Sequence, residues 1–136
     1  MFKEKPLLGW GPATYQFQYA PFQISTEKTI ISTNYGEGGN AHSEYLGALV
    51  DSGIPGALLY LLLLIVSIRR GIIIRRTHRE KHIRYLSLAL VAGLITYAVH
   101  GALNNFLDTD KISALFWGML AAIVAIDVGV KEEEKI

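Results

Sequence analysis

Residues 54–68 read IPGALLYLLLLIVSI, a run without a single charged side chain. Counted from Ser52 to the first charge at Arg69, the charge-free stretch is seventeen residues long. A helix needs roughly 17 to 25 predominantly apolar residues to cross a bilayer. The run therefore predicts a membrane-spanning helix over about residues 52–70. Pro55 suits its first turn, because the amide proton that proline lacks is not needed for a helical bond there.

Two further stretches have the same character. Residues 85–103 contain no formal charge apart from the titratable His100, and residues 112–130 contain only Asp127, close to their end. A carboxylate is tolerated near a membrane surface and costly at mid-depth. A soluble amphipathic helix needs a polar face, which these stretches lack. The sequence therefore predicts an all-α membrane protein with three transmembrane helices, in agreement with its 51% hydrophobic composition.

The charges are gathered between the first two predicted spans. All six arginines lie with Lys81 in one segment of sixteen residues: Arg69, Arg70, Arg75, Arg76, Arg79 and Arg84. Short basic loops stay on the cytoplasmic side. Residues 1–53 and the loop 104–111 are therefore expected to face outwards, and the tail 131–136 to lie in the cytoplasm. A nucleic-acid or anionic-lipid patch is the weaker alternative, because topology already accounts for the arginines, and we expect no nucleic-acid partner.

Residues 1–53 have the composition of a structured loop against the membrane. Breakers of regular structure are frequent: Pro6, Gly9, Gly11, Pro12, Pro21 and the run Gly36-Glu37-Gly38-Gly39. Between them, Tyr15, Phe17 and Tyr19 alternate with less apolar residues. This pattern is compatible with a short strand or with an interfacial segment whose rings lie at the headgroup level. The chain has no cysteine, which excludes disulfides and thiolate metal sites.

The residues best suited to chemistry lie just before the first span. His42 and Glu44 follow the glycine run, and the apolar side chains after them have helical spacing: Tyr45, Leu46, Leu49 and Val50. We expect a short interfacial helix over Ala41 to about Asp51, ending at Gly53. A helix N-terminus disfavours the protonated imidazolium. The position therefore favours a neutral His42 ring that accepts a proton, as a general base must.

The same segment carries a spaced pattern of four residues: His42, Ser43, Gly53 and Gly56. This pattern resembles the late motif of the O-antigen ligase family, which reads His, then Asn, Ser or Gln, nine unspecified residues, Gly, two unspecified residues, and Gly, Thr or Tyr. The upstream PLLGWGPATY, which holds Gly9 and Gly11, resembles the Gly-x-Gly stretch that commonly precedes the motif. The resemblance covers nearly the whole chain but only the last part of the family's usual length. It implies the C-terminal portion of a larger polytopic bundle, with further N-terminal helices of the same protein as partners.

The resemblance also implies a reaction. Family members transfer a glycan, with inversion, from an undecaprenyl-pyrophosphate donor to a lipid or glycan acceptor hydroxyl in a bacterial cytoplasmic membrane, with no nucleotide sugar and no essential metal or other cofactor. His42 would be the base, with residues 1–53 facing the periplasm. The departing pyrophosphate needs cations, which the family is thought to supply with outer-loop arginines. The outward cations here are all lysines: Lys3, Lys5, Lys28 and Lys111. The arginines are therefore expected upstream of Met1, and the chain alone is expected to be inactive.

Several other residues are weaker candidates. Ser43, Glu44 and His100 are possible substrate-binding groups, although Glu44 also suits a capping role at a helix start and His100 also suits packing against a neighbouring helix. The backbone is expected to turn into the membrane at Gly53, Pro55 and Gly56, which are more typical of such a turn than of ligand contacts. Gly9 and Gly11 are further structural positions of the motif. Asp108 and Asp110 are more typical of solvated or capping groups than of a metal site.

A different class of function stays open at this level. A non-catalytic polytopic protein, such as a transporter or an assembly protein, would share the same helical framework. Ligase and polymerase activities use the same donor and differ in the acceptor, so the sequence does not choose between them.

Overall fold

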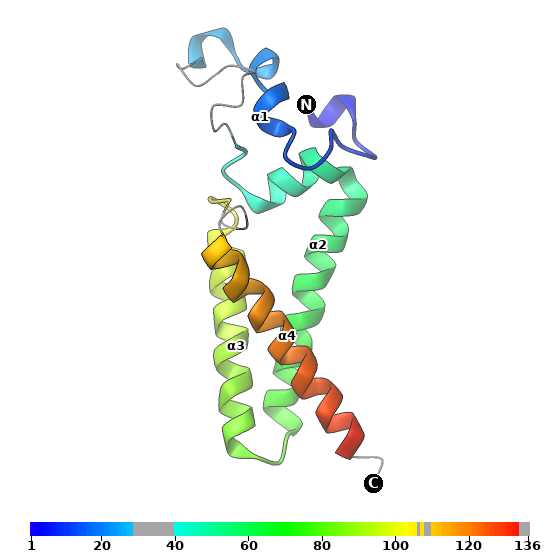
Figure 1. Ribbon diagram of the computed structural model, residues 1–136, viewed down its shortest axis with the longest axis vertical. Coiled ribbons are helices and arrows are strands. Elements are labelled where there is room, and N and C mark those ends of the chain that lie inside the picture. The colour runs from blue at the N-terminus through cyan, green and yellow to red at the C-terminus, as the bar shows by residue number, and fades with distance from the viewer. Residues whose placement is uncertain (29–39, 106, 108–109, 134–136) are drawn as a thin grey trace. The chain divides into compact units, whose positions relative to one another are not determined.

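The computed structural model describes residues 1–28, 40–105, 107 and 110–133, which form helices and no strand (Figure 1). Four short elements come first: η1 (Phe2–Glu4), α1 (Tyr15–Gln18), η2 (Ala20–Phe22) and η3 (Ser25–Glu27). Three long helices follow: α2 (Glu44–Thr77), α3 (Lys81–His100) and α4 (Asp110–Glu133). The glycine run 36–39, Asp108 and residues 134–136 lie outside the described residues.

The three long helices of the described residues are long and apolar enough to cross a membrane, over Glu44–Thr77, Lys81–His100 and Lys111–Gly129. The predicted all-α class with three spans is therefore confirmed. Within the most apolar window of each helix, only 17% to 22% of the residues are buried inside the chain. Most of their apolar side chains are thus free to contact lipid or other helices, as membrane helices do.

The chain divides into two units. The first comprises Met1–Leu61 and Gly101–Asn105, and the second comprises Leu62–His100 and Phe106–Ile136. The first unit therefore holds the predicted motif and part of the loop after α3, and the second holds most of the membrane-spanning length.

In the second unit α3 packs against α4 around a small aromatic and aliphatic core. Leu94, Phe116 and Ile123 are almost completely buried, and the rings of Tyr97 and Phe116 lie 4.5 Å apart. Gly93 contributes by its small size, because a Cβ added there would overlap the Sδ atom of Met119. Small residues allow the close helix approach on which packing in a membrane depends.

The second part of α2 meets α3 at another glycine. The buried Ser87 hydroxyl donates a hydrogen bond of 2.7 Å to the Gly71 carbonyl, and the Val91 side chain occupies the space that a Cβ on Gly71 would need. Ser87 is completely buried, so water has no access to replace a lost partner. The bond therefore ties α2 to α3.

Replacing Ser87 by alanine is expected to lower the free energy of unfolding by about 1 kcal/mol, the size of an interhelical hydrogen bond in a membrane protein. Denaturant titration of the purified protein in detergent measures this. Thr96→Ala is the matched control, because Thr96 is an exposed hydroxyl residue on the same helix. Equal losses of stability in both variants would mean that the hydrogen bond from Ser87 to Gly71 does not contribute measurably to the free energy of unfolding.

Helix α2 continues beyond the predicted end of the first span near residue 70 and stops at Thr77. Arg75 and Arg76 therefore lie in the helix, although they were expected in the loop after it, whereas Arg69 and Arg70 lie at the predicted end of the span. Long arginine side chains keep their charge near water while their stems cover apolar surface. One of them has a partner on α4, since Arg70 Nε lies 3.6 Å from Asp127 Oδ2. This ion pair accounts for a carboxylate near the end of the third span.

Candidate active site

Helix α2 is broken at Gly53. This residue has φ 68° and ψ −167° within the helix, a conformation that is essentially restricted to glycine. A Cβ on Gly53 would also overlap the carbonyl of Leu7. Pro55 lies two residues after the break, in the first turn of the continuing helix, where a missing amide proton costs least. The break therefore separates a short helical segment, Glu44–Ser52, from the membrane-spanning part.

The N-terminal loop completes the hydrogen bonding at this kink. Three backbone bonds join them: Trp10 N–H to the Val50 carbonyl (2.9 Å), Gly11 N–H to the Asp51 carbonyl (2.9 Å) and Ile54 N–H to the Pro6 carbonyl (2.8 Å). In an unbroken helix the Val50 carbonyl would accept a hydrogen bond from the Ile54 amide, but that amide donates to Pro6 here. The Asp51 carbonyl would be paired with the amide of residue 55, which is a proline and has no N–H. The loop supplies the missing donors, and Figure 1 shows it lying along the bend of α2.

Two glycines make this close approach possible. Gly9 has φ 66°, and a Cβ there would overlap the Asp51 carbonyl. Gly11 has φ 106°. The loop then continues through Ala13, whose amide donates to Asp51 Oδ2 at 3.3 Å. The predicted structural glycines thus lie together, with Gly9 against Asp51 and Gly53 against Leu7.

Ser43 and Glu44 begin the short helical segment and are both buried. Ser43 Oγ accepts a hydrogen bond from the Leu46 amide at 3.4 Å, and the Ser43 carbonyl accepts one from Gly47 at 2.8 Å, the geometry of an N-cap. The Glu44 amide donates to the Gly101 carbonyl at 2.9 Å. These contacts attach the segment after α3 to the start of α2 within the first unit. The helix therefore begins at Glu44 and not at Ala41, because the Ser43 side chain satisfies its first turn.

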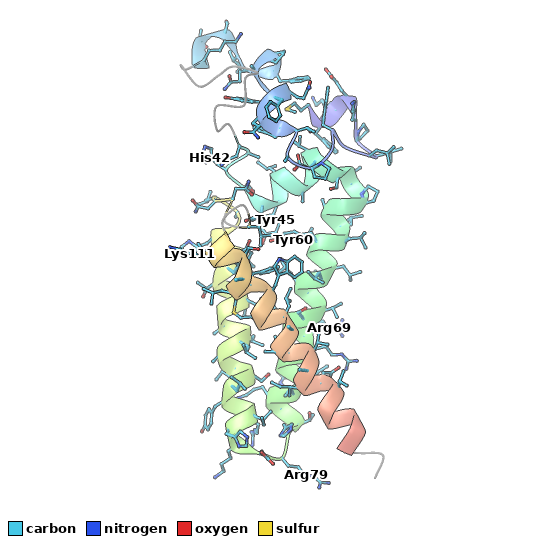
Figure 2. All side chains as sticks on the ribbon, in the orientation of Figure 1. His42, Tyr45, Tyr60, Arg69, Arg79 and Lys111 are labelled. Carbon is cyan, nitrogen blue, oxygen red and sulfur yellow. The ribbon has the colours of Figure 1, made fainter. Side chains whose placement is uncertain are left out.

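His42 lies two residues before this helix, with its side chain exposed (Figure 2). Its backbone has φ 46°, in the left-handed region that residues other than glycine seldom adopt. The His42 amide donates to Asn40 Oδ1 at 2.9 Å, which holds the turn. Strained backbone of this kind collects at functional sites. Asn40 was not among the predicted site residues, although an Asn two positions before a turn residue is a known signal for such a bond.

The geometry gives the motif spacing a physical meaning. Its nine unspecified residues are the helical segment Glu44–Ser52, with the Ser43 cap at one end and the Gly53 break at the other. At 1.5 Å per residue this segment is about 13 Å long. Gly56 lies one turn beyond Ser52, and a Cβ on it would overlap the Ser52 side chain. The motif therefore fixes how far His42 stands from the entry into the span.

Aromatic side chains support the loop around the site. The stretch with alternating aromatics forms the helix α1 and not a strand. Tyr15 and Tyr19 are therefore one turn apart, and their rings stack with centroids 5.1 Å apart and planes 10° from parallel. Burial, and then the neighbouring Tyr19, raise the pKa of Tyr15 above its usual value.

Two other aromatic contacts lie in the same unit. Trp10 packs edge-on against Phe22, and Lys5 Nζ lies 4.1 Å from the Trp10 ring centroid. In Figure 2, Tyr45 and Tyr60 face each other across the bend of α2, with their ring centroids 5.7 Å apart.

His100, the remaining predicted site residue, is the last residue of α3 and is exposed. It belongs to the second unit, whereas His42, Ser43 and Glu44 belong to the first. A role for His100 in binding substrate therefore stays a prediction.

Comparison with known proteins agrees with the motif. Residues 1–61 match the model of a protein family described as O-antigen ligase. The matched range ends at the same residue as the N-terminal stretch of the first unit, Met1–Leu61. The searches of curated proteins and of solved structures found no match. The family match confirms the resemblance predicted from the residue pattern over residues 1–61, which is less than half of the chain.

Proposed function

We propose, from the match of residues 1–61 to the O-antigen ligase family model, that the chain is the C-terminal part of a membrane glycan transferase. The enzyme moves a polysaccharide from an undecaprenyl-pyrophosphate donor to the hydroxyl of a lipid or glycan acceptor. One observation carries the proposal. In the unit that matches the family, an exposed histidine is held in a left-handed turn directly before a capped helix.

In the proposed reaction His42 acts as the general base. Its ring takes the proton of the acceptor hydroxyl while the hydroxyl oxygen forms a bond to the anomeric carbon of the donor sugar. The bond from that carbon to the pyrophosphate oxygen breaks, and the pyrophosphate leaves with the electron pair. Attack opposite the leaving group inverts the anomeric configuration. A single base of this kind typically contributes about 10²- to 10⁴-fold to a rate.

The leaving pyrophosphate needs cationic partners as its charge develops. Residues 1–61 contain no arginine, and their cations are Lys3, Lys5 and Lys28, all of them exposed. Lys5 is already held over the Trp10 ring. We therefore propose that arginines from other helices of the same protein complete the site. We also propose that the site faces the periplasm, since the arginine-rich end of α2 and the start of α3 belong on the cytoplasmic side of the inner membrane.

The test is transfer in a reconstituted system. A protein that carries this chain together with the other helices of its bundle is placed in vesicles with a synthetic undecaprenyl-pyrophosphate glycan and an acceptor. We expect acceptor-linked glycan with an inverted linkage, detected by mass spectrometry and NMR, and no transfer from a nucleotide sugar. An intact donor in the presence of folded protein, or a retained configuration, would contradict the proposal.

A further inference from the structure

A small cavity lies where α2 ends and α3 begins, inside the second unit. It has a volume of about 90 Å³ and is lined by Arg75, Lys81, Arg84 and Tyr85. Two contacts order its wall. Arg84 Nε donates to the Arg75 carbonyl at 3.1 Å, and the Arg75 guanidinium lies 5.9 Å from the Tyr85 ring centroid. We call this the basic cavity.

The basic cavity is lined by three positively charged side chains. Among the described residues, neither Arg75, Lys81 nor Arg84 forms an ion pair. The nearest acidic residue in the sequence, Glu80, has its carboxylate 3.1 Å from His82 Nε2. Three like charges around one small space repel one another. An anion in that space would replace this repulsion with attraction.

The arrangement of the donors favours one class of anion. Arginine presents a planar fork of N–H groups that matches phosphate oxygens, and lysine adds a compact point charge. Arg84 is already held by its bond to the Arg75 carbonyl, so less side-chain freedom is lost when a ligand binds. We propose that the basic cavity binds a phosphate group, either the headgroup of an anionic lipid or a free phosphate ion. This inference is independent of the proposed glycan transfer.

The position of the basic cavity suits a lipid headgroup. It lies at one end of two helices that are apolar enough to span a membrane. Exposed apolar side chains lie on the same helices within two turns of it, including Ile73 on α2 and Leu86 and Leu88 on α3. Tyr85 itself is 66% exposed, and tyrosine rings are enriched at the level of lipid headgroups. A phosphate in the cavity would therefore have room for acyl chains beside it.

The test is a titration of the full chain in a neutral detergent. Phosphatidic acid is added and bound lipid is counted by native mass spectrometry, with phosphatidylcholine, whose phosphate is balanced by its own choline cation, as the comparison without net charge. The double variant Arg75→Gln/Lys81→Gln removes two cavity charges and keeps the hydrogen bond of Arg84. We expect it to weaken phosphatidic acid binding by about tenfold or more, since each basic group near a lipid surface contributes substantially to binding.

Arg69→Gln/Arg79→Gln is the matched control, because it removes two exposed charges of the same basic segment that do not line the cavity. Figure 2 labels both positions, Arg69 on α2 and Arg79 in the turn. We expect this control to change binding by about twofold at most, as for diffuse surface charge. Equal losses in the two double variants, or no loss in the cavity variant, would overturn the proposal. Competition by inorganic phosphate identifies a site for the ion itself, and its failure identifies a lipid site.

Discussion

Replacement of His42 by alanine, in a protein that carries this chain, is expected to lower the rate of glycan transfer by about 10²- to 10⁴-fold, the usual contribution of one general base. The loss should appear in the chemical step and not in the amount of folded protein. His42 is exposed and its turn is fixed through its backbone amide, so alanine removes the ring without removing a buried contact. The measurement is single-turnover transfer from a lipid-linked donor at matched protein amounts.

Two further variants sharpen this prediction. His82→Ala makes the same chemical change at an exposed histidine of the second unit, whose Nε2 lies 3.1 Å from a Glu80 carboxylate oxygen, and it should leave the rate unchanged. Asn40→Ala removes the acceptor of the His42 amide bond. We expect it to reduce the rate by about tenfold, because a displaced catalytic group loses part of its effective concentration. Full activity of His42→Ala would exclude a catalytic role for this residue.

Substitution of Gly53 by alanine is expected to have the largest effect on stability, a loss on the order of 3 kcal/mol or more. Alanine would be forced into a backbone conformation that only glycine adopts easily, and its Cβ would overlap the Leu7 carbonyl. Either α2 becomes straight at residue 53 or the N-terminal loop separates from it. Both outcomes break the hydrogen bonds between the loop and the carbonyls of Val50 and Asp51. Thermal unfolding in detergent and limited proteolysis of residues 1–28 measure the effect.

Gly118→Ala provides the matched control for this change. Gly118 is a helical residue of α4, and a Cβ there would meet nothing within 4 Å among the described residues. Alanine is the better helix former by roughly 1 kcal/mol, so this variant should be neutral or slightly more stable. If Gly53→Ala unfolds at the same temperature as Gly118→Ala, the kink is not under the constraint inferred here.

The fold class could be predicted because a membrane imposes a simple rule on the sequence. A helix in lipid satisfies its own backbone, so the absence of charge over a sufficient length is enough to identify a span. The helix ends could not be placed in this way. Helix α2 continues to Thr77 through four arginines. Hydropathy indicates which residues are apolar enough to lie in lipid, but it does not indicate where the backbone hydrogen bonds of the helix end. The pairing of Arg70 with Asp127 joins residues that are far apart in the chain, and no local pattern reveals it.

The candidate site could be predicted in part, for a similar reason. The helix break and the short helix before it lie where local residue types place them, and Gly53 has a non-helical backbone conformation. The partner of that break could not be foreseen. Trp10 and Gly11 donate to carbonyls forty residues later, and a single sequence carries no signal for contacts at such separation. The burial of Ser43 and its hydrogen bond to the Leu46 amide could not be predicted from its residue type, and its role in binding substrate stays a prediction.

The helical segment between Ser43 and Gly53 has a consequence for how this protein tolerates changes in length. Each helical residue rotates what precedes it by about 100° and shifts it by 1.5 Å. A single insertion or deletion within Glu44–Ser52 would therefore place the His42 imidazole on another side of the helix axis, even if His42, Ser43, Gly53 and Gly56 were all unchanged. Added or lost residues are better absorbed on the N-terminal side of Asn40, where they leave the register between the imidazole and the bend intact.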